Sequence, residues 1–158
     1  MSQVGSGGCT ALGGVMVDLW QCDALGTYSD VSGAGQASTL GQDFLRGYQL
    51  TDANGEARFT TVYPGWYQGR ATHIHFKLRH TAGGTATQEF TSQLFFDDAL
   101  SDTIYSTVSP YTTKGANRSV RNRNDNIYGN GGHQLLLALT GDAAGGYAGT
   151  LDIGMNIA

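Results

Sequence analysis

Two of the four histidines, His73 and His75, stand at alternate positions in the segment that runs from Tyr63 to Phe76. Alternate side chains of a β-strand point to the same face, so a strand here would place both imidazoles side by side. Tyr67 precedes His73 by six residues and follows the turn signal Pro64-Gly65. Two imidazoles beside a phenol could form one side of a metal site, although the same spacing also occurs on strands that bind nothing.

The remaining ligands of such a site must come from elsewhere in the chain. His80 and His133 have no motif around them, and we expect surface or packing roles for both. No Cys-x-x-Cys pair, Asp cluster or His-Glu pattern is present to complete a zinc site. Tyr28 and Tyr67, however, each follow a glycine by two residues. A phenolate is a hard anionic donor that suits ferric iron better than zinc, although either tyrosine alone could simply pack in the core.

Hydrophobic alternation and turn residues indicate the elements that must position these side chains. We expect a long loop over 22–41, which carries Tyr28, and a polar region over 97–130 that is mostly loop, with a short helical turn near Asp98. Turns are expected at 52–55 and at 83–84, where Asn and Gly supply left-handed backbone. The predicted strands cover 15–20, 44–50, 57–63, 72–80, 89–96, 133–139 and 147–157.

Seven or more short strands separated by turns predict an all-β, single-domain β-sandwich with long functional loops. We expect residues 1–14 to form an irregular leading segment and residues 15–158 to form the catalytic domain. Only 14% of the 158 residues are charged and 24 are glycine, which also favours β structure. The net charge of −4 and the lack of a long basic run argue against nucleic-acid binding. No apolar run approaches the ~20 residues of a membrane span.

The two cysteines, Cys9 and Cys22, invite a disulfide, but the predicted strand separates them. An extended chain over 14–22 runs ~26 Å at about 3.3 Å per residue, and residues 9–14 can return at most ~17 Å. The remaining gap exceeds the ~7 Å limit between the Cα atoms of a disulfide. We therefore expect no bridge unless a bend or bulge interrupts the strand.

The sequence resembles the intradiol ring-cleavage dioxygenases, the ferric-iron family that includes catechol and protocatechuate dioxygenases. The resemblance extends over most of residues 9–157 and is strongest over 17–29, 44–55 and 59–75, with a weaker match over 92–96. It implies a non-haem Fe(III) centre, a catechol-type diol and O2 as substrates, and a cis,cis-muconate-type diacid as product. The implied iron ligands are Tyr28, Tyr67, His73 and His75.

The resemblance also implies roles for three residues around the iron. Arg70 falls on the active-site arginine of the family, Gln93 falls on its pocket glutamine, and Tyr67 falls on the tyrosine that dissociates when substrate binds. A departing tyrosinate can accept a proton from the catechol, and a guanidinium can stabilise charge on the ring. The alternatives are a surface salt bridge for Arg70 and an ordinary strand hydrogen bond for Gln93. Arg46 lies in a matching segment, and we interpret it as a framework residue.

Two other classes of function compete with the enzyme. The first is a non-catalytic β-sandwich module that binds carbohydrate or protein, for which exposed Trp20 and Trp66 would be evidence. The second is a metal-binding hydrolase. Longer relatives carry a region before the β-core that covers the pocket, so we expect a more open site and a monomer here. The segment from Trp20 to Asp23 resembles exported members of the family, which hints at secretion.

Overall fold

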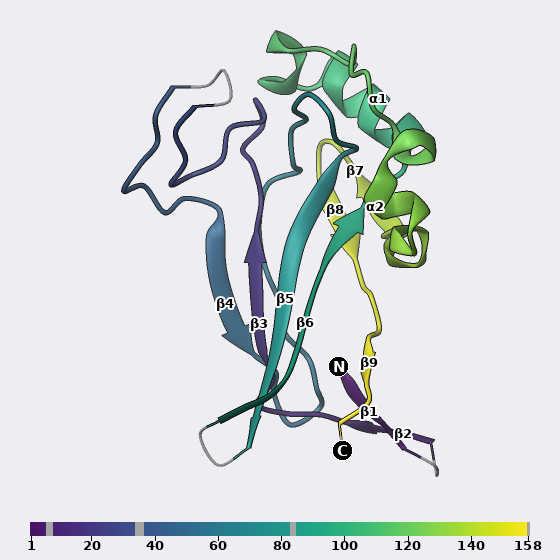
Figure 1. Cartoon of the computed structure of the whole chain (residues 1–158). Coiled ribbons are helices and arrows are strands. Elements are labelled where there is room, and N and C mark those ends of the chain that lie inside the picture. The colour runs from purple at the N-terminus through teal and green to yellow at the C-terminus, as the bar shows by residue number, and fades with distance from the viewer. Residues whose placement is uncertain (6–7, 34–36, 83–84, 158) are drawn as a thin grey trace.

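The computed structural model describes residues 1–5, 8–33, 37–82 and 85–157. Its main layer is a four-stranded antiparallel sheet with the strand order β4-β3-β5-β6 (Figure 1). The strands are β3 (Met16–Trp20), β4 (Arg46–Leu50), β5 (His73–Ala82) and β6 (Thr85–Phe95). Four of the predicted strands are thereby confirmed. The predicted turn at 83–84 lies outside the described residues.

One face of this sheet packs on the hydrophobic core. Phe76 and Leu78 of β5 are buried there together with Val15 and Met155. Because side chains alternate along a strand, His73 and His75 fall on the opposite face. In the register of the sheet, His75 stands between Trp20 of β3 and Gln93 of β6.

A second, three-stranded sheet joins the two ends of the chain in the order β2-β1-β9. Strands β1 (Ser2–Gly5) and β2 (Gly8–Ala11) form an antiparallel pair, and β1 also runs parallel to β9 (Gly154–Met155). Both termini therefore lie at the same end of the molecule (Figure 1). The expectation of an irregular segment over 1–14 was wrong, because β1 and β2 pair with each other and β1 also pairs with β9, about 150 positions away in the sequence.

Three other predicted strands differ from the structure. Residues 57–63 form no strand: their exposed and half-buried side chains alternate except at Thr61, but none of the described strands pairs with them. The turn before them is confirmed, since Asp52 Oδ1 accepts hydrogen bonds from the backbone N–H groups of Asn54 and Glu56. The first three residues of 133–139 lie in the 3-10 helix η3 (Gly132–Leu135), and only Leu139 belongs to a strand. The predicted strand over 147–157 is divided between β9 and β8 (Gly146–Gly149), and β8 pairs with β7 (Leu139–Asp142).

The polar region over 97–130 is more helical than expected. Helix α1 (Asp98–Thr107) has ten residues, and Asp97 caps it by accepting a hydrogen bond from the backbone N–H of Leu100. The short helices η1 (Tyr111–Thr113), η2 (Asn122–Asn124) and α2 (Asn126–Gly129) follow. None of the helices in the described residues is long and apolar enough to cross a membrane.

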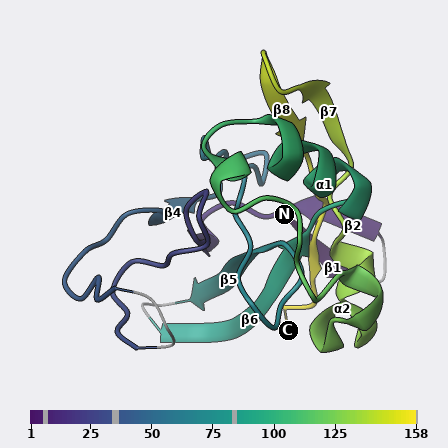
Figure 2. The same cartoon turned by 90° about the horizontal axis from the view of Figure 1, so that it is seen from above.

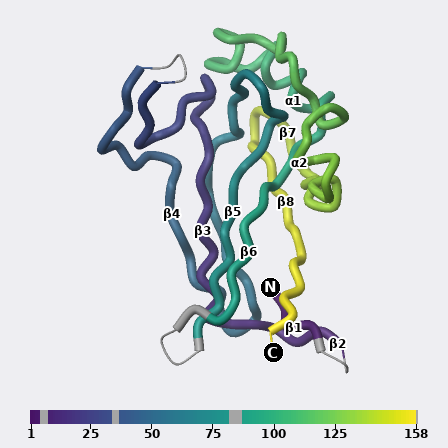
Figure 3. Tube along the Cα trace, in the orientation of Figure 1, coloured from purple at the N-terminus to yellow at the C-terminus, as the bar shows by residue number. Residues whose placement is uncertain are grey.

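The helices and the described part of the loop over 22–41 flank the same end of the main sheet (Figure 1). Viewed from above, the described part of this loop lies on the opposite side of the molecule from α2 (Figure 2). The Cα trace shows the antiparallel strands β5 and β6 lying side by side, with one end of each at this end of the sheet (Figure 3). Cys9 is exposed on β2, whereas Cys22 is buried at the start of the loop, and both thiols are free, as predicted.

Candidate metal centre

His73 and His75 are the first and third residues of β5, at the end of the sheet where the loops gather. His73 is buried, and its Nδ1–H donates to the carbonyl oxygen of Ala71 at 2.7 Å. This hydrogen bond leaves the lone pair of Nε2 available. The ring of His75 stacks parallel to the indole of Trp20, with 4.9 Å between centroids. Both imidazoles are therefore held in defined orientations.

The four predicted ligands converge on one point. Nε2 of His73 lies 3.1 Å from Nε2 of His75, 3.2 Å from the Tyr67 hydroxyl and 3.4 Å from the Tyr28 hydroxyl. Donor atoms about 2 Å from a shared ion stand roughly 3.0–3.6 Å apart at the usual coordination angles. The arrangement therefore fits one metal ion among two imidazole nitrogens and two phenol oxygens.

Burial sets the protonation of these four groups. It lowers the pKa of His73 to about 4 and, with the help of the neighbouring His73, that of His75 to about 3. Burial also raises the pKa of the Tyr28 and Tyr67 hydroxyls. Charged forms lose hydration when they are buried, so the imidazoles are neutral at pH 7 and the phenols lose their protons to a base only when a strong cation binds the oxygen.

Tyr28 is held by hydrogen bonds to its own carbonyl oxygen and to the next residue, Ser29. The hydroxyl of Thr39 donates to the carbonyl oxygen of Tyr28 at 2.7 Å. The guanidinium of Arg46 donates to both the hydroxyl and the carbonyl oxygen of Ser29, which is fully buried. Arg46 thus belongs to the framework of the site, in agreement with its interpretation from the sequence.

Tyr67 is carried by a segment that packs against α1 and the chain after it. Trp66 is buried with Tyr105 and Tyr111, and its indole N–H donates to the carbonyl oxygen of Gly115 at 2.7 Å. The hydroxyl of Tyr105 donates to the carbonyl oxygen of Pro64 at 2.8 Å. These contacts end at Trp66, so Tyr67 stands at the border between a fixed segment and the exposed turn that follows it.

The two tyrosine-bearing loops meet backbone to backbone. The N–H of Gly65 donates to the carbonyl oxygen of Asp23 at 2.9 Å, and the thiol of Cys22 donates to the carbonyl oxygen of Gly65 at 3.4 Å. The ammonium of Lys114 donates to the carbonyl oxygens of both Leu25 and Trp66, at 2.9 Å and 2.7 Å. The relative placement of the two phenols depends on this contact, which the sequence analysis did not predict.

Arg70 and Gln93, the two predicted catalytic residues besides Tyr67, lie in contact beside the histidines. The guanidinium of Arg70 donates to Oε1 of Gln93, and Nε2 of the same amide lies 3.3 Å from Nδ1 of His75. Gln93 therefore bridges the guanidinium and one imidazole. Arg70 also pairs with Asp125, whose side chain is wholly buried. Sequence reasoning missed Asp125, although a carboxylate just before Asn-Ile-Tyr is a recognisable helix start.

The other candidate donors stay away from this point. His80 is half-buried near the far end of β5, where Nδ1 lies 3.0 Å from the Thr87 hydroxyl, and His133 is exposed in η3. Within the described ranges, no three His, Cys, Asp or Glu side chains are grouped closely enough to bind a metal. The mixed set of two imidazoles and two phenols is thus the arrangement that fits a metal ion.

Comparison with known proteins agrees with this geometry. A family model described as a dioxygenase matches residues 3–128. Catechol 1,2-dioxygenase from Candida albicans is 34% identical over 88 residues, which cover 44% of this chain and 27% of that protein. The chain thus aligns with little more than a quarter of the length of this curated relative.

Two solved structures have folds that match nearly all of this chain. An intradiol ring-cleavage dioxygenase from Tetranychus urticae has a TM-score of 0.80 and 28% identity, covering 98% of this chain and 77% of that one. The dioxygenase domain of a dioxygenase and carbohydrate-binding fusion from Streptomyces sp. SirexAA-E has a TM-score of 0.62 and 28% identity, covering 93% and 71%. The family match over most of the chain and these shared folds show that the protein belongs to the intradiol ring-cleavage dioxygenase family.

Proposed function

We propose that this protein is a non-haem Fe(III)-dependent dioxygenase that cleaves catechol-type diols between their hydroxylated carbons. O2 and the diol are the substrates, and a cis,cis-muconate-type diacid is the product. The observation that carries the proposal is the convergence of Tyr28, Tyr67 and His75 within 3.1–3.4 Å of Nε2 of His73. Membership of the family supports the reaction class.

The donor chemistry favours ferric iron over zinc. Phenolate oxygen is a hard ligand, and desolvation opposes the phenolate form of both Tyr28 and Tyr67. A trivalent cation compensates for that penalty better than a divalent one because its attraction for each anionic oxygen is larger. The imidazoles already have low pKa values and present neutral nitrogens. Bound Fe(III) would activate the chelated catecholate for reaction with O2.

The two tyrosines can take different roles in the reaction because the surrounding residues hold them differently. Tyr28 is tied through Thr39 and through the Arg46–Ser29 hydrogen bonds, so we assign it as the phenolate that remains. Tyr67 precedes an exposed turn in which Gly69 has a φ of +90°. In the proposed reaction the Tyr67 oxygen takes one catechol proton and moves away, which leaves room for the second catecholate oxygen. Arg70 then stabilises negative charge on the ring.

The structure gives little support to the two competing functions, a carbohydrate- or protein-binding module and a metal-binding hydrolase. A carbohydrate-binding surface needs an exposed aromatic platform, whereas Trp66 is 6% exposed and Trp20 is covered on one face by His75. A zinc hydrolase would need ligands of the usual His, Cys and carboxylate types, and the described residues do not gather three of them. We therefore do not favour either alternative.

Iron analysis and product analysis test the proposal together. The purified protein should contain about one iron per chain and be red-brown, since tyrosinate-to-Fe(III) charge transfer absorbs visible light. Catechol and O2 should yield a muconate diacid. A colourless, iron-free protein after reconstitution with iron salts, or a yellow semialdehyde product formed by cleavage outside the diol, would refute it.

A further inference from the structure

Asp125 is a buried carboxylate whose hydrogen-bonding contacts serve two tasks. Oδ1 accepts from the backbone N–H groups of Ile127 and Tyr128, at 2.9 Å and 3.0 Å, and so caps α2. Oδ2 accepts from Nε–H of Arg70 and from the N–H of Ala71, both at 2.9 Å. Capping a four-residue helix needs only the first oxygen. The second oxygen is directed at the candidate active site.

The contact with Asp125 determines how the Arg70 guanidinium is presented. Its Nε side faces the carboxylate, and one terminal nitrogen donates to Oε1 of Gln93. The same terminal nitrogen lies 3.5 Å from Oδ1 of Asp125, the guanidinium also lies within reach of the Tyr67 hydroxyl, and 22% of the Arg70 side chain is exposed. A guanidinium held on two edges keeps its third edge in a fixed direction, where it can meet charge on a bound ring.

Asp125 also acts on the peptide that leads to the histidines. The N–H of Ala71 donates to Oδ2 of Asp125, while the carbonyl oxygen of Ala71 accepts from Nδ1–H of His73. One buried carboxylate therefore fixes both Arg70 and the residue that orients the first imidazole. Charge-assisted hydrogen bonds of this kind are stronger than neutral ones and impose a defined geometry.

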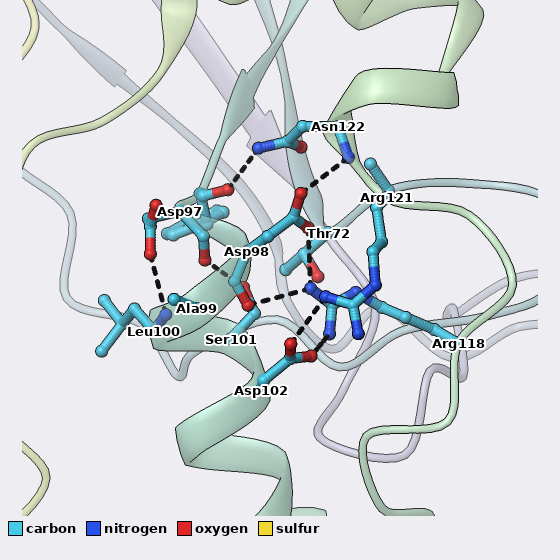
Figure 4. Close-up of polar contacts among 12 residues, drawn as sticks. Thr72, Asp97, Asp98, Ala99, Leu100, Ser101, Asp102, Arg118, Arg121 and Asn122 are labelled. Atoms are coloured by element: carbon cyan, nitrogen blue, oxygen red, sulfur yellow. Dashed lines mark hydrogen bonds and ion pairs between the residues drawn. The ribbon is translucent and has the colours of Figure 1, made fainter.

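The segment that precedes Asp125 is attached to α1 through a network around Arg118 (Figure 4). The buried guanidinium of Arg118 pairs with Asp98, at 2.7 Å, and with Asp102. Asp98 Oδ2 also accepts from the N–H of Asn122 at 3.0 Å, and the Asn122 amide donates to the carbonyl oxygen of Phe96 at 2.8 Å. Asn122 opens the short helix η2, which ends immediately before Asp125. The carboxylate is thus attached to a rigid support.

We propose that Asp125 is a positioning residue that aims the Arg70 guanidinium at the charge that develops on the catechol ring. The role rests on the proposed dioxygenase function. It predicts that Asp125→Asn, which keeps an oxygen able to accept from the N–H of Ala71, impairs turnover mainly through Arg70. A purely structural carboxylate would instead contribute equally whether or not the guanidinium were there.

A double-mutant cycle of the iron-loaded enzyme tests this prediction. Asp125→Asn should lower kcat for catechol by roughly 10- to 100-fold, with iron content and colour close to wild type, a loss typical of outer hydrogen-bond partners of a metal site. In an Arg70→Ala background, the same change should lower kcat by less than about twofold. Equal losses in both backgrounds, or loss of iron from Asp125→Asn, would overturn the proposal.

Two further variants keep the test decisive. Asp125→Ser retains a side-chain oxygen that can cap α2, so it should give the same cycle if Asp125→Asn fails to fold. Asp142→Asn is the matched control, because Asp142 also accepts from two backbone N–H groups but lies at the exposed end of β7, just before the turn to β8. Its kcat should equal that of the wild type.

A readout without turnover separates this proposal from the proposed function. In 15N NMR spectra of the iron-free protein, the Nε–H of Arg70 should be protected from exchange and should lose that protection in Asp125→Asn. An Arg70 signal that does not change would refute the positioning role even if catechol cleavage is established. A wild-type enzyme without catechol turnover would refute the proposed function and, with it, any role for Asp125 in that reaction.

Discussion

Gly65 is the residue at which the smallest possible side chain should disable the metal centre without touching a ligand. A Cβ atom at this position would lie 2.6 Å from the carbonyl oxygen of Ala24 and closer still to that of Asp23. The first distance is about 0.8 Å short of the 3.4 Å at which ordinary contact begins. Both obstacles are backbone atoms of the loop that carries Tyr28, so neither can rotate away.

The cost of Gly65→Ala follows from these distances. Overpacking a closely fitted contact costs roughly 1–3 kcal/mol, and the hydrogen bond from Gly65 to Asp23 is worth about 1 kcal/mol more. We therefore expect the iron-free protein to lose about 2–4 kcal/mol of unfolding free energy. A separation of about 0.8 Å between the loops also exceeds the ~0.2 Å tolerance of metal–ligand distances. Iron affinity should fall by at least about tenfold.

Two measurements check this prediction. Urea unfolding of the iron-free variant gives the change in stability, and an iron titration followed by the tyrosinate charge-transfer band gives the affinity. Gly47→Ala is the matched control, since a Cβ atom on Gly47 of β4 would meet nothing within 4 Å. That variant should unfold within about 1 kcal/mol of the wild type and bind iron normally. A Gly65→Ala protein with unchanged iron affinity would refute the claim that this contact sets the distance between the phenols.

Three other changes test the site directly. Arg70→Ala should keep iron and colour but slow turnover by ~10²-fold, as removal of a charge-stabilising donor does; loss of iron would show a framework role. Tyr67→Phe should retain some iron with altered colour and slow catecholate formation, whereas Tyr28→Phe should abolish tyrosinate charge transfer in the substrate complex. Anaerobic crystals with catechol in which Tyr28 has left the iron and Tyr67 remains would reverse these roles. Burial alone would raise the pKa of Asp125, but hydrogen bonds from Arg70 and the backbone lower it from 3.8 to about 2. Its carboxylate should therefore contribute about 2 kcal/mol to the free energy of unfolding above pH 3.8, and this contribution should be lost as the pH falls toward 2. When stability is measured across the acid range, Asp125→Asn should lack this pH-dependent loss.

The sequence by itself determined the features that depend on local periodicity and residue chemistry. The alternation of His73 and His75 required both to share a face of β5, because successive side chains of a strand point to opposite sides. Few Cys or carboxylate patterns compete with Tyr28 and Tyr67 near their glycines, and the resemblance to the dioxygenase family implied the four candidate ligands that the fold brings together.

Only the tertiary structure decided which distant segments touch. The Arg70–Asp125 pair spans 55 positions, and the β1–β9 pairing joins Ser2 to Gly154. Neither the hydrophobic periodicity nor the secondary-structure propensity of one segment predicts which distant segment it contacts, since such contacts depend on how the intervening chain folds back. For the same reason the sequence showed glycine at position 65 but not the Asp23 carbonyl that excludes any larger side chain there. Local pattern and family resemblance therefore indicated the candidate ligands, and packing between remote loops set the distances among them.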